Sequence, residues 1–260
     1  MSRIKKFFIA FFTVLLVFSL VSIAKTYVLD YVNEQQMKEL AEIRNKAMDK
    51  GEGATPSPFI TNTKAHEPAM LSEFQELYKR NPDIVGWLKI DDTRIDYPIM
   101  QNQQDAQYYL NHDFDKERNK NGLPFLDEYS HIDHSDILLI HGHHMNSGAM
   151  FADLMKYKKE SYYMEHPTFQ FSTLYEKEEY EIVAVILSKV YRKTDEVFKY
   201  YQISQVDTSA EFNSYIENIQ KLALYDTGVT AQYGDKLIVL STCEYSTKNG
   251  RLAVVARKRK

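Results

Sequence analysis

The sequence contains one cysteine, Cys243, which lies at the end of the apolar run LIVLSTC (237–243). A single thiol cannot form an intramolecular disulfide, so it is either buried and inert or exposed for its chemistry. The run predicts a strand, and Asn249-Gly250 beyond it is a strong hairpin signal. Arg251 opens the returning strand, where antiparallel pairing places it beside Cys243. A guanidinium there can stabilise a thiolate or a developing oxyanion, because it keeps its charge.

Three of the eight histidines, His141, His143 and His144, follow the apolar strand DILLI (136–140). The end of a strand is a place where a rigid scaffold presents side chains to a ligand. One interpretation makes these residues ordinary surface-loop histidines. A second makes one of them the proton carrier for a nucleophile elsewhere in the chain. Such a histidine would complete a site made of a nucleophile, an electrophile stabiliser and a general acid or base.

A third interpretation of the histidines is a metal site. His141 and His143 are alternate residues, which share one face of a strand and could both bind zinc. The pattern resembles the H-x-H-x-D-H run of metallo-hydrolases, but Met145 stands at the Asp position. The segment HIDH (131–134) is near enough in sequence to complete such a site. Metal motifs depend on fixed ligand spacing, so the missing Asp weakens this alternative.

Residues 7–24 form a stretch of 18 residues without a charge, which is long enough to span a membrane as a helix. Three basic residues within 1–6 precede it, and this charge excess predicts a cytoplasmic N-terminus with everything after Lys25 outside the cell. The alternative is a cleavable signal peptide, for which Ser22 and Ala24 could supply the cleavage site. Signal h-regions are usually shorter, which favours the anchor. Under both interpretations, the rest of the chain is exported.

The exported part divides into a connecting segment and one larger domain. Residues 25–69 predict a helical stalk followed by a linker that contains GEGATPSP (51–58). Residues 70–260 are enough for one sizeable domain, in which the catalytic residues would lie. The formal net charge of −4 and a pI near 6.1 argue against a nucleic-acid partner.

Short strands with a few helices dominate the pattern of residues 70–260. Strands are predicted for GWLKI, RIDYPIM, DILLI, TFQFSTL, YEIVAVILSKVY, KLIVLSTC and RLAVVAR. One helix is predicted from Ser72, with Gln75 completing a capping box, and another over about 210–224 with Thr208 as its cap. Many short strands with few helices favour a β-barrel or a sandwich.

Two motifs resemble those of the sortases, the membrane-anchored cysteine transpeptidases of Gram-positive bacteria, and most closely those of class B. VLSTC (239–243) is similar to the nucleophile signature T-L-x-T-C, with Val in place of the first Thr. HGHHM (141–145) is similar to the class B histidine motif Y-G-H-N-M, and the arginine falls in NGRLAVVA. The enlarged segment 192–230 before the cysteine strand also resembles class B. The likeness covers about residues 70–257.

The resemblance implies a mainly β protein: a closed, eight-stranded sortase-type β-barrel with peripheral helices, preceded by an N-terminal transmembrane helix. Cys243 would be the nucleophile and His143 the general acid and base. Arg251 would hold the oxyanion or the substrate backbone. No cofactor and no metal is implied. The catalytic domain would lie outside the cell on a single-pass anchor in the cell membrane.

The resemblance also implies substrates and the residues that bind them. Ser241, Glu244 and Leu110 would line the substrate groove. The substrates would be exported proteins with a C-terminal sorting signal, NPxTN-like or PxTG-like, cleaved after Thr and joined to the amine of a peptidoglycan precursor. Two alternatives stay open from the residues themselves. One is an exported zinc-dependent hydrolase that uses His141 and His143, and the other is a non-catalytic, membrane-anchored binding domain.

Overall fold

The computed structural model describes residues 3–49 and 69–260, and the predicted linker 51–58 lies outside these ranges. The first helix, α1, runs from Arg3 to Asp49. By their contacts, the residues form two compact units, and the boundary between the units falls inside α1, between Glu39 and Leu40.

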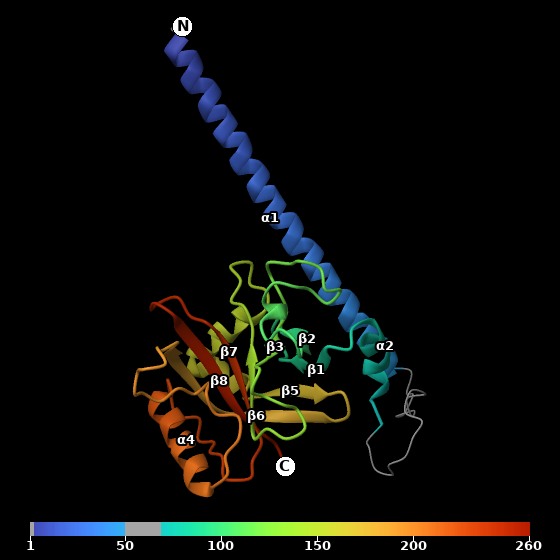
Figure 1. Ribbon diagram of the computed structural model, residues 1–260, viewed down its shortest axis with the longest axis vertical. Coiled ribbons are helices and arrows are strands. Elements are labelled where there is room, and N and C mark those ends of the chain that lie inside the picture. The colour runs from blue at the N-terminus through green and yellow to red at the C-terminus, as the bar shows by residue number, and fades with distance from the viewer. Residues whose placement is uncertain (1–2, 50–68) are drawn as a thin grey trace. The chain divides into compact units, whose positions relative to one another are not determined.

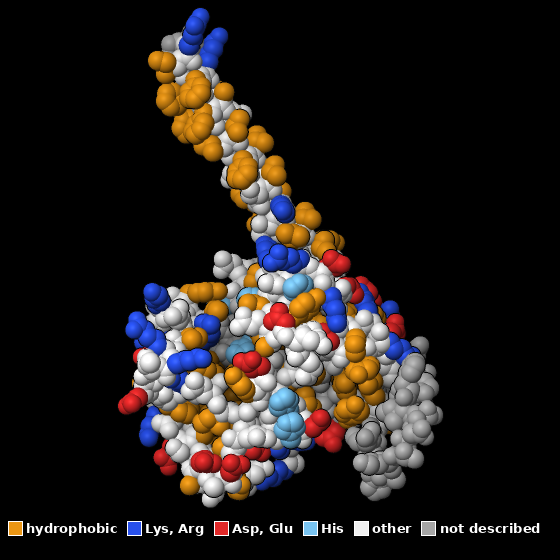
Figure 2. All heavy atoms as spheres, viewed as in Figure 1, with side chains coloured by type: hydrophobic (Ala, Val, Ile, Leu, Met, Phe, Trp, Pro, Cys, Tyr) orange, Lys and Arg blue, Asp and Glu red, His pale blue; other side chains and the backbone are white. Residues whose placement is uncertain are grey.

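The N-terminal part of α1 is apolar on all sides. In the described part of the chain, α1 is the one helix that is long and apolar enough to cross a membrane. Side chains such as Phe7, Leu16 and Val21 are exposed along it. Figure 2 shows hydrophobic side chains over its visible surface, with Lys and Arg at the N-terminal end. A helix that is apolar all round requires an apolar environment, which a membrane supplies.

Within residues 69–260, eight strands form a closed barrel in the spatial order β1-β2-β3-β4-β7-β8-β6-β5 (Figure 1). The β2–β3 and β4–β7 pairs are parallel and the other neighbours are antiparallel. The barrel confirms the predicted fold, and closure leaves no free edge strand. The strands are β1 (Ile84–Lys89), β2 (Asp96–Met100), β3 (Phe125–Leu126), β4 (Ile137–His141), β5 (Thr168–Thr173), β6 (Lys177–Lys189), β7 (Leu237–Cys243) and β8 (Gly250–Lys258).

Short helices lie before and between the strands, at the periphery of the barrel. They are α2 (Ser72–Arg80), η1 (Tyr108–Leu110), η2 (Phe151–Lys158), α3 (Glu160–Glu165) and α4 (Ser209–Leu222). The cap of α4 is the predicted one, because the Thr208 side chain accepts the N–H of Glu211. The predicted cap of α2 is wrong, because Leu71 is the N-cap and Ser72 lies inside the helix. The Leu71 N–H donates to the Leu174 carbonyl at 2.8 Å, so a tertiary contact sets where α2 begins.

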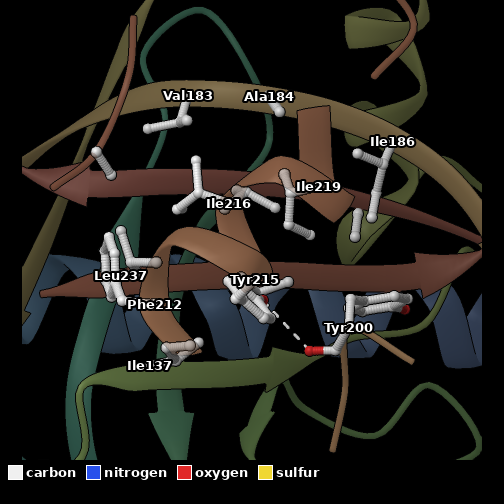
Figure 3. Close-up of a cluster of buried hydrophobic side chains, with 14 of the residues drawn as sticks. Ile137, Val183, Ala184, Ile186, Tyr200, Phe212, Tyr215, Ile216, Ile219 and Leu237 are labelled. Carbon is white, nitrogen blue, oxygen red and sulfur yellow. Dashed lines mark hydrogen bonds between the residues drawn. The ribbon is translucent and has the colours of Figure 1, made fainter. Parts of the chain in front are cut away.

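One hydrophobic cluster packs α4 onto strands β4, β6, β7 and β8 (Figure 3). Phe212, Tyr215, Ile216 and Ile219 follow the spacing of one helix face, and all are buried. Burying each such side chain contributes about 1.5–3 kcal/mol to stability. The cluster residues on three of the strands are alternate residues, Ile137 and Leu139 on β4, Leu237 and Val239 on β7, and Ala253 and Val255 on β8. Because side chains alternate along a strand, the same face continues to the strand ends at His141, Ser241, Cys243 and Arg251.

Candidate active site

Strands β7 and β8 place Cys243 and Arg251 opposite each other. The two residues are Cα partners in the antiparallel ladder, next to the connecting loop. Asn249, with a φ of 60°, lets the loop turn, and the Gly250 N–H closes it by donating to the Thr247 carbonyl at 3.0 Å. The Arg251 guanidinium donates to the Gly250 carbonyl at 3.0 Å. Cys243 and Arg251 are therefore neighbours across the ladder, as the hairpin predicts.

Parallel pairing of β4 with β7 brings the histidine segment to the same edge of the barrel as Cys243. His143 and Cys243 are 100 positions apart in sequence, but the carboxyl ends of parallel strands meet at one edge. The pairing continues just past β4, where the Thr242 hydroxyl donates to the Gly142 carbonyl at 2.8 Å. This register leaves His143 and Cys243 at the mouth of one cavity.

The ring of His143 has a fixed orientation. Its Nε2 lies 2.8 Å from the carbonyl oxygen of Leu110, the last residue of η1. A carbonyl oxygen can only accept, so Nε2 carries the hydrogen and Nδ1 is left to take up or return a proton. The backbone is also held, because the His143 carbonyl accepts the Phe151 N–H at 2.8 Å. These contacts give His143 the defined tautomer that a general acid or base needs.

A cavity of about 280 Å³ joins these residues. Its size is close to the lower end of the range for ligand pockets. Five of the six residues predicted for the site line it, namely Leu110, His143, Ser241, Cys243 and Arg251. The rest of the wall is made by Ala106, Gln107, Phe125, Asp127, Glu128, His141, Gly142 and Thr242.

Glu244, the sixth predicted site residue, is not among the residues that line the cavity. Its carboxylate accepts hydrogen bonds from Ser246 Oγ at 2.6 Å and Lys158 Nζ at 3.0 Å, and only 7% of the residue is exposed. The bonds from Ser246 and Lys158 hold the pKa of Glu244 below its usual range. Glu244 therefore ties the loop that follows Cys243 to η2.

His144 and His141 have partners of their own. His144 Nδ1 donates to the backbone carbonyl of Cys243 at 3.0 Å, so it holds the main chain at Cys243. His141 Nε2 lies 2.9 Å from Asp127 Oδ2, and both residues line the cavity. Asp127 follows the two-residue strand β3. Sequence reasoning missed it, because nothing in the residues around it indicates that it lies beside His141.

The residues considered for zinc are dispersed. Residues 3–49 and 69–260 contain no group of three His, Cys, Asp or Glu residues that could hold a metal ion. His131 and His134 stack on each other with ring centroids 4.6 Å apart, and neither lines the cavity. His141 and His143 each direct Nε2 to a different partner. The geometry gives the zinc alternative no support.

Ser241 has a partner that sequence reasoning also missed. Its Oγ lies 2.7 Å from the phenol oxygen of Tyr200, and each of the two residues is only 2% exposed. Tyr200 lies in the irregular segment between β6 and α4, within the enlarged region 192–230. A contact across 41 positions into such a segment leaves no local signal in the sequence.

Known proteins match the part of the chain that contains these cavity residues. A model of the sortase domain matches residues 88–259. Sortase B of Listeria monocytogenes is 36% identical over 185 residues, which cover 70% of this chain and 72% of that protein. Sortase B of Staphylococcus aureus is 30% identical over 197 residues, or 74% of this chain and 77% of that protein. The crystal structure of sortase B from B. anthracis in complex with AAEK1 superposes with a TM-score of 0.72, covering 90% of this chain and 99% of that one at 30% identity.

A thiol and an arginine on neighbouring strands share a cavity with an oriented histidine at the edge of a closed β-barrel, and these are groups that can carry out acyl transfer through a cysteine. The chain belongs to the sortase family. Sortases are membrane-associated enzymes of the cell wall, and they act as cysteine transpeptidases. The relatives named above are sortases B, and within the family the chain falls in class B.

Proposed function

We propose that this protein cleaves the C-terminal sorting signal of an exported protein after Thr and joins the new end to an amine of a peptidoglycan precursor. The cavity that Cys243, His143 and Arg251 share is the observation that carries this proposal. Its nucleophile, proton carrier and charged donor are the three groups that acyl transfer to an amine requires.

The first step is acylation of Cys243. The thiolate sulfur attacks the carbonyl carbon of the Thr residue and forms a C–S bond, while the electron pair of the C=O bond moves to the oxygen. The peptide C–N bond then breaks, His143 donates its proton to the departing nitrogen, and the C-terminal fragment leaves with a free amine. Arg251 holds the oxyanion or the peptide carbonyl during this step. The product is a thioester between Cys243 and the shortened protein.

The second step transfers the acyl group to the incoming amine. His143, now neutral, accepts a proton from the amine nitrogen, which attacks the thioester carbon. The C–S bond breaks, and its electron pair returns to Cys243 as the thiolate. Each proton given in the first step is thus recovered in the second, and no cofactor takes part.

The remaining cavity residues would bind the peptide. Leu110 supplies an apolar wall, and Ser241 supplies a hydroxyl. Glu244 acts indirectly, because Lys158 and Ser246 occupy its carboxylate. The sorting signal is NPxTN-like or PxTG-like, and both motifs contain the Thr after which the chain would be cleaved.

The membrane topology belongs to the same proposal. Residues 7–24 of α1 would stay in the cell membrane, with the N-terminus in the cytoplasm and the barrel outside. An anchored enzyme of this kind meets its substrate proteins and the precursor at the outer surface of the membrane.

Full-length protein in detergent, mixed with fluorogenic peptides that carry each sorting motif, tests the reaction. We expect cleavage after Thr, transfer to an added amine, and no turnover by Cys243→Ala, because the chain has no other thiol. Thiol alkylation should abolish cleavage and a chelator should not. Turnover retained by Cys243→Ala, or lost with the chelator alone, would contradict the cysteine mechanism and favour the zinc hydrolase.

A further inference from the structure

One face of β7 passes from the hydrophobic cluster into the cavity. Leu237 and Val239 belong to the cluster, whereas Ser241 and Cys243 line the cavity. Tyr200 lies at the boundary between the two regions, because it belongs to the cluster and its phenol oxygen is 2.7 Å from Ser241 Oγ. Tyr200, the hydrogen-bond partner of Ser241, is therefore part of the hydrophobic cluster.

The surroundings of the two hydroxyls indicate which of them donates. Tyr200 is 2% exposed, and Ser241 Oγ is the hydrogen-bond partner of its phenol in the described part of the chain. A buried O–H without an acceptor is unfavourable, and Ser241 lines the cavity, where its own O–H can reach another acceptor, so we assign the phenol as the donor to Ser241 Oγ. Burial also raises the pKa of Tyr200 to about 12, so the phenol keeps its proton throughout the neutral range. The hydrogen of the Ser241 hydroxyl is then left for a different acceptor.

We propose that Tyr200 is a positioning residue for substrate binding. Its phenol occupies one acceptor site of Ser241 Oγ and leaves the Ser241 O–H directed to the cavity, where it donates to a backbone carbonyl oxygen of the bound peptide. This inference rests on the proposed function, since it assigns the hydroxyl to the same peptide that Cys243 attacks. An extended peptide offers such carbonyl acceptors along its whole length.

The packing of α4 holds Tyr200 in place. Tyr215 of α4 is 1% exposed, and its hydroxyl donates to the Tyr200 carbonyl at 3.3 Å (Figure 3). The enlarged segment between β6 and β7 thereby contacts a residue of the cavity wall, because its buried Tyr200 is hydrogen-bonded to Ser241. The geometry gives that segment a role in binding as well as in covering the sheet.

The substitution Tyr200→Phe removes the phenol oxygen and keeps the ring in the cluster. Without its donor, the Ser241 hydroxyl can rotate away from the cavity, and the peptide contact weakens. We expect kcat/KM for peptide cleavage to fall roughly 3- to 10-fold, the range for one hydrogen bond, mainly through KM. The rate at which iodoacetamide alkylates Cys243 should not change. A merely structural role would disturb β7 and alter that rate as well.

Two further variants complete the experiment. Tyr163→Phe removes another buried tyrosine hydroxyl, one that donates to the Thr227 carbonyl at 3.0 Å, and should leave KM unchanged. In a Ser241→Ala background, Tyr200→Phe should cause no further loss, because the hydroxyl it orients is gone. The double variant also removes both partners of the buried bond, so it remains informative if Tyr200→Phe alone folds poorly.

The results separate the possible failures. An unchanged KM in Tyr200→Phe, multiplied losses in the double variant, or an altered alkylation rate would each overturn the positioning role. If the wild-type protein leaves both sorting peptides intact, the proposed function itself is wrong, and this inference falls with it. A KM increase that disappears in the Ser241→Ala background supports the role of Tyr200.

Discussion

Each of the three neighbouring histidines has one ring nitrogen bound, and they differ in the partner: a backbone carbonyl of Leu110 for His143, the Asp127 carboxylate for His141 and the Cys243 carbonyl for His144. In His143, Nε2 is fixed on the Leu110 carbonyl, and Nδ1 is left for proton transfer. We expect His143→Ala to lower kcat by about 10²- to 10⁴-fold, the usual contribution of general acid and base catalysis. His141→Ala and His144→Ala should each weaken activity only modestly. Steady-state cleavage of a sorting peptide by the three variants provides the measurement.

The pattern of losses among these variants discriminates between mechanisms. His144→Asn keeps a donor for the Cys243 carbonyl and restores the residue usual in class B, so it should be closer to wild type than His144→Ala. Equal, severe losses at all three histidines, together with zinc found by elemental analysis, would contradict the assignment of His143.

Arg251 is expected to act through its planar pair of donors as well as its charge. A guanidinium offers two parallel N–H groups to an oxyanion, whereas lysine offers a point charge on a flexible stem. Arg251→Lys should therefore lose most activity, by about 10²- to 10³-fold if the donors serve the oxyanion. Peptide cleavage and alkylation of Cys243 against pH should both be measured. A Lys variant with near-normal values of both would show that charge alone is enough.

At the scale of single residues, the sequence indicates the groups with strong local signals. Cys243 is the sole thiol, and Asn249-Gly250 sets the turn that returns Arg251 to it. Periodicity and spacing did not indicate which of the three histidines is the general acid and base. The family resemblance assigned that role to His143. Asp127 and Tyr200 reach the site through tertiary contacts, which no local pattern records.

The loop between β7 and β8 should be sensitive to acid through Glu244. The folded state lowers the pKa of this carboxyl from its ordinary value of 4.5, so its contribution to stability is fully present above that value. The contribution is lost as the pH falls through the lower, folded-state pKa. We expect Glu244→Gln to cost about 1 kcal/mol at neutral pH, and this cost should shrink in strong acid.

Urea unfolding of wild type and Glu244→Gln across the acid range measures this effect. The exposed Glu196→Gln serves as the control and should change the unfolding free energy by little at any pH. A cost for Glu244→Gln that stays constant down to the lowest pH would contradict the assigned role of the carboxylate.

At the scale of elements, patterning predicted the strands and α4 well and their arrangement less well. Alternating and β-branched runs gave the segments of β1, β2 and β4 to β8, and the cap at Thr208 gave the start of α4. The sequence pattern did not decide between a barrel and a sandwich, because the order of the strands depends on long-range pairing. The parallel β4–β7 pair, which assembles the site, has no local signature. The two-residue β3 is too short to show a period.

At the scale of the whole molecule, the predicted topology can be tested on cells. With residues 7–24 retained in the membrane and the barrel outside, protease treatment of intact protoplasts should release the barrel domain. A cytoplasmic protein serves as the control for lysis. Mature protein whose N-terminal sequence begins at Lys25 would instead show a cleaved signal peptide.

During synthesis, the ribosome completes β4 long before β7, since 100 positions separate His143 from Cys243. Their parallel pairing is a contact of high sequence separation, which costs more loop-closure entropy than a local contact. His143 and Cys243 therefore come to one cavity only after β7 has emerged and paired with β4. A nascent chain that has not yet reached β7 lacks the single cysteine of the sequence, so the cavity with its three groups exists only once the C-terminal strands are in place.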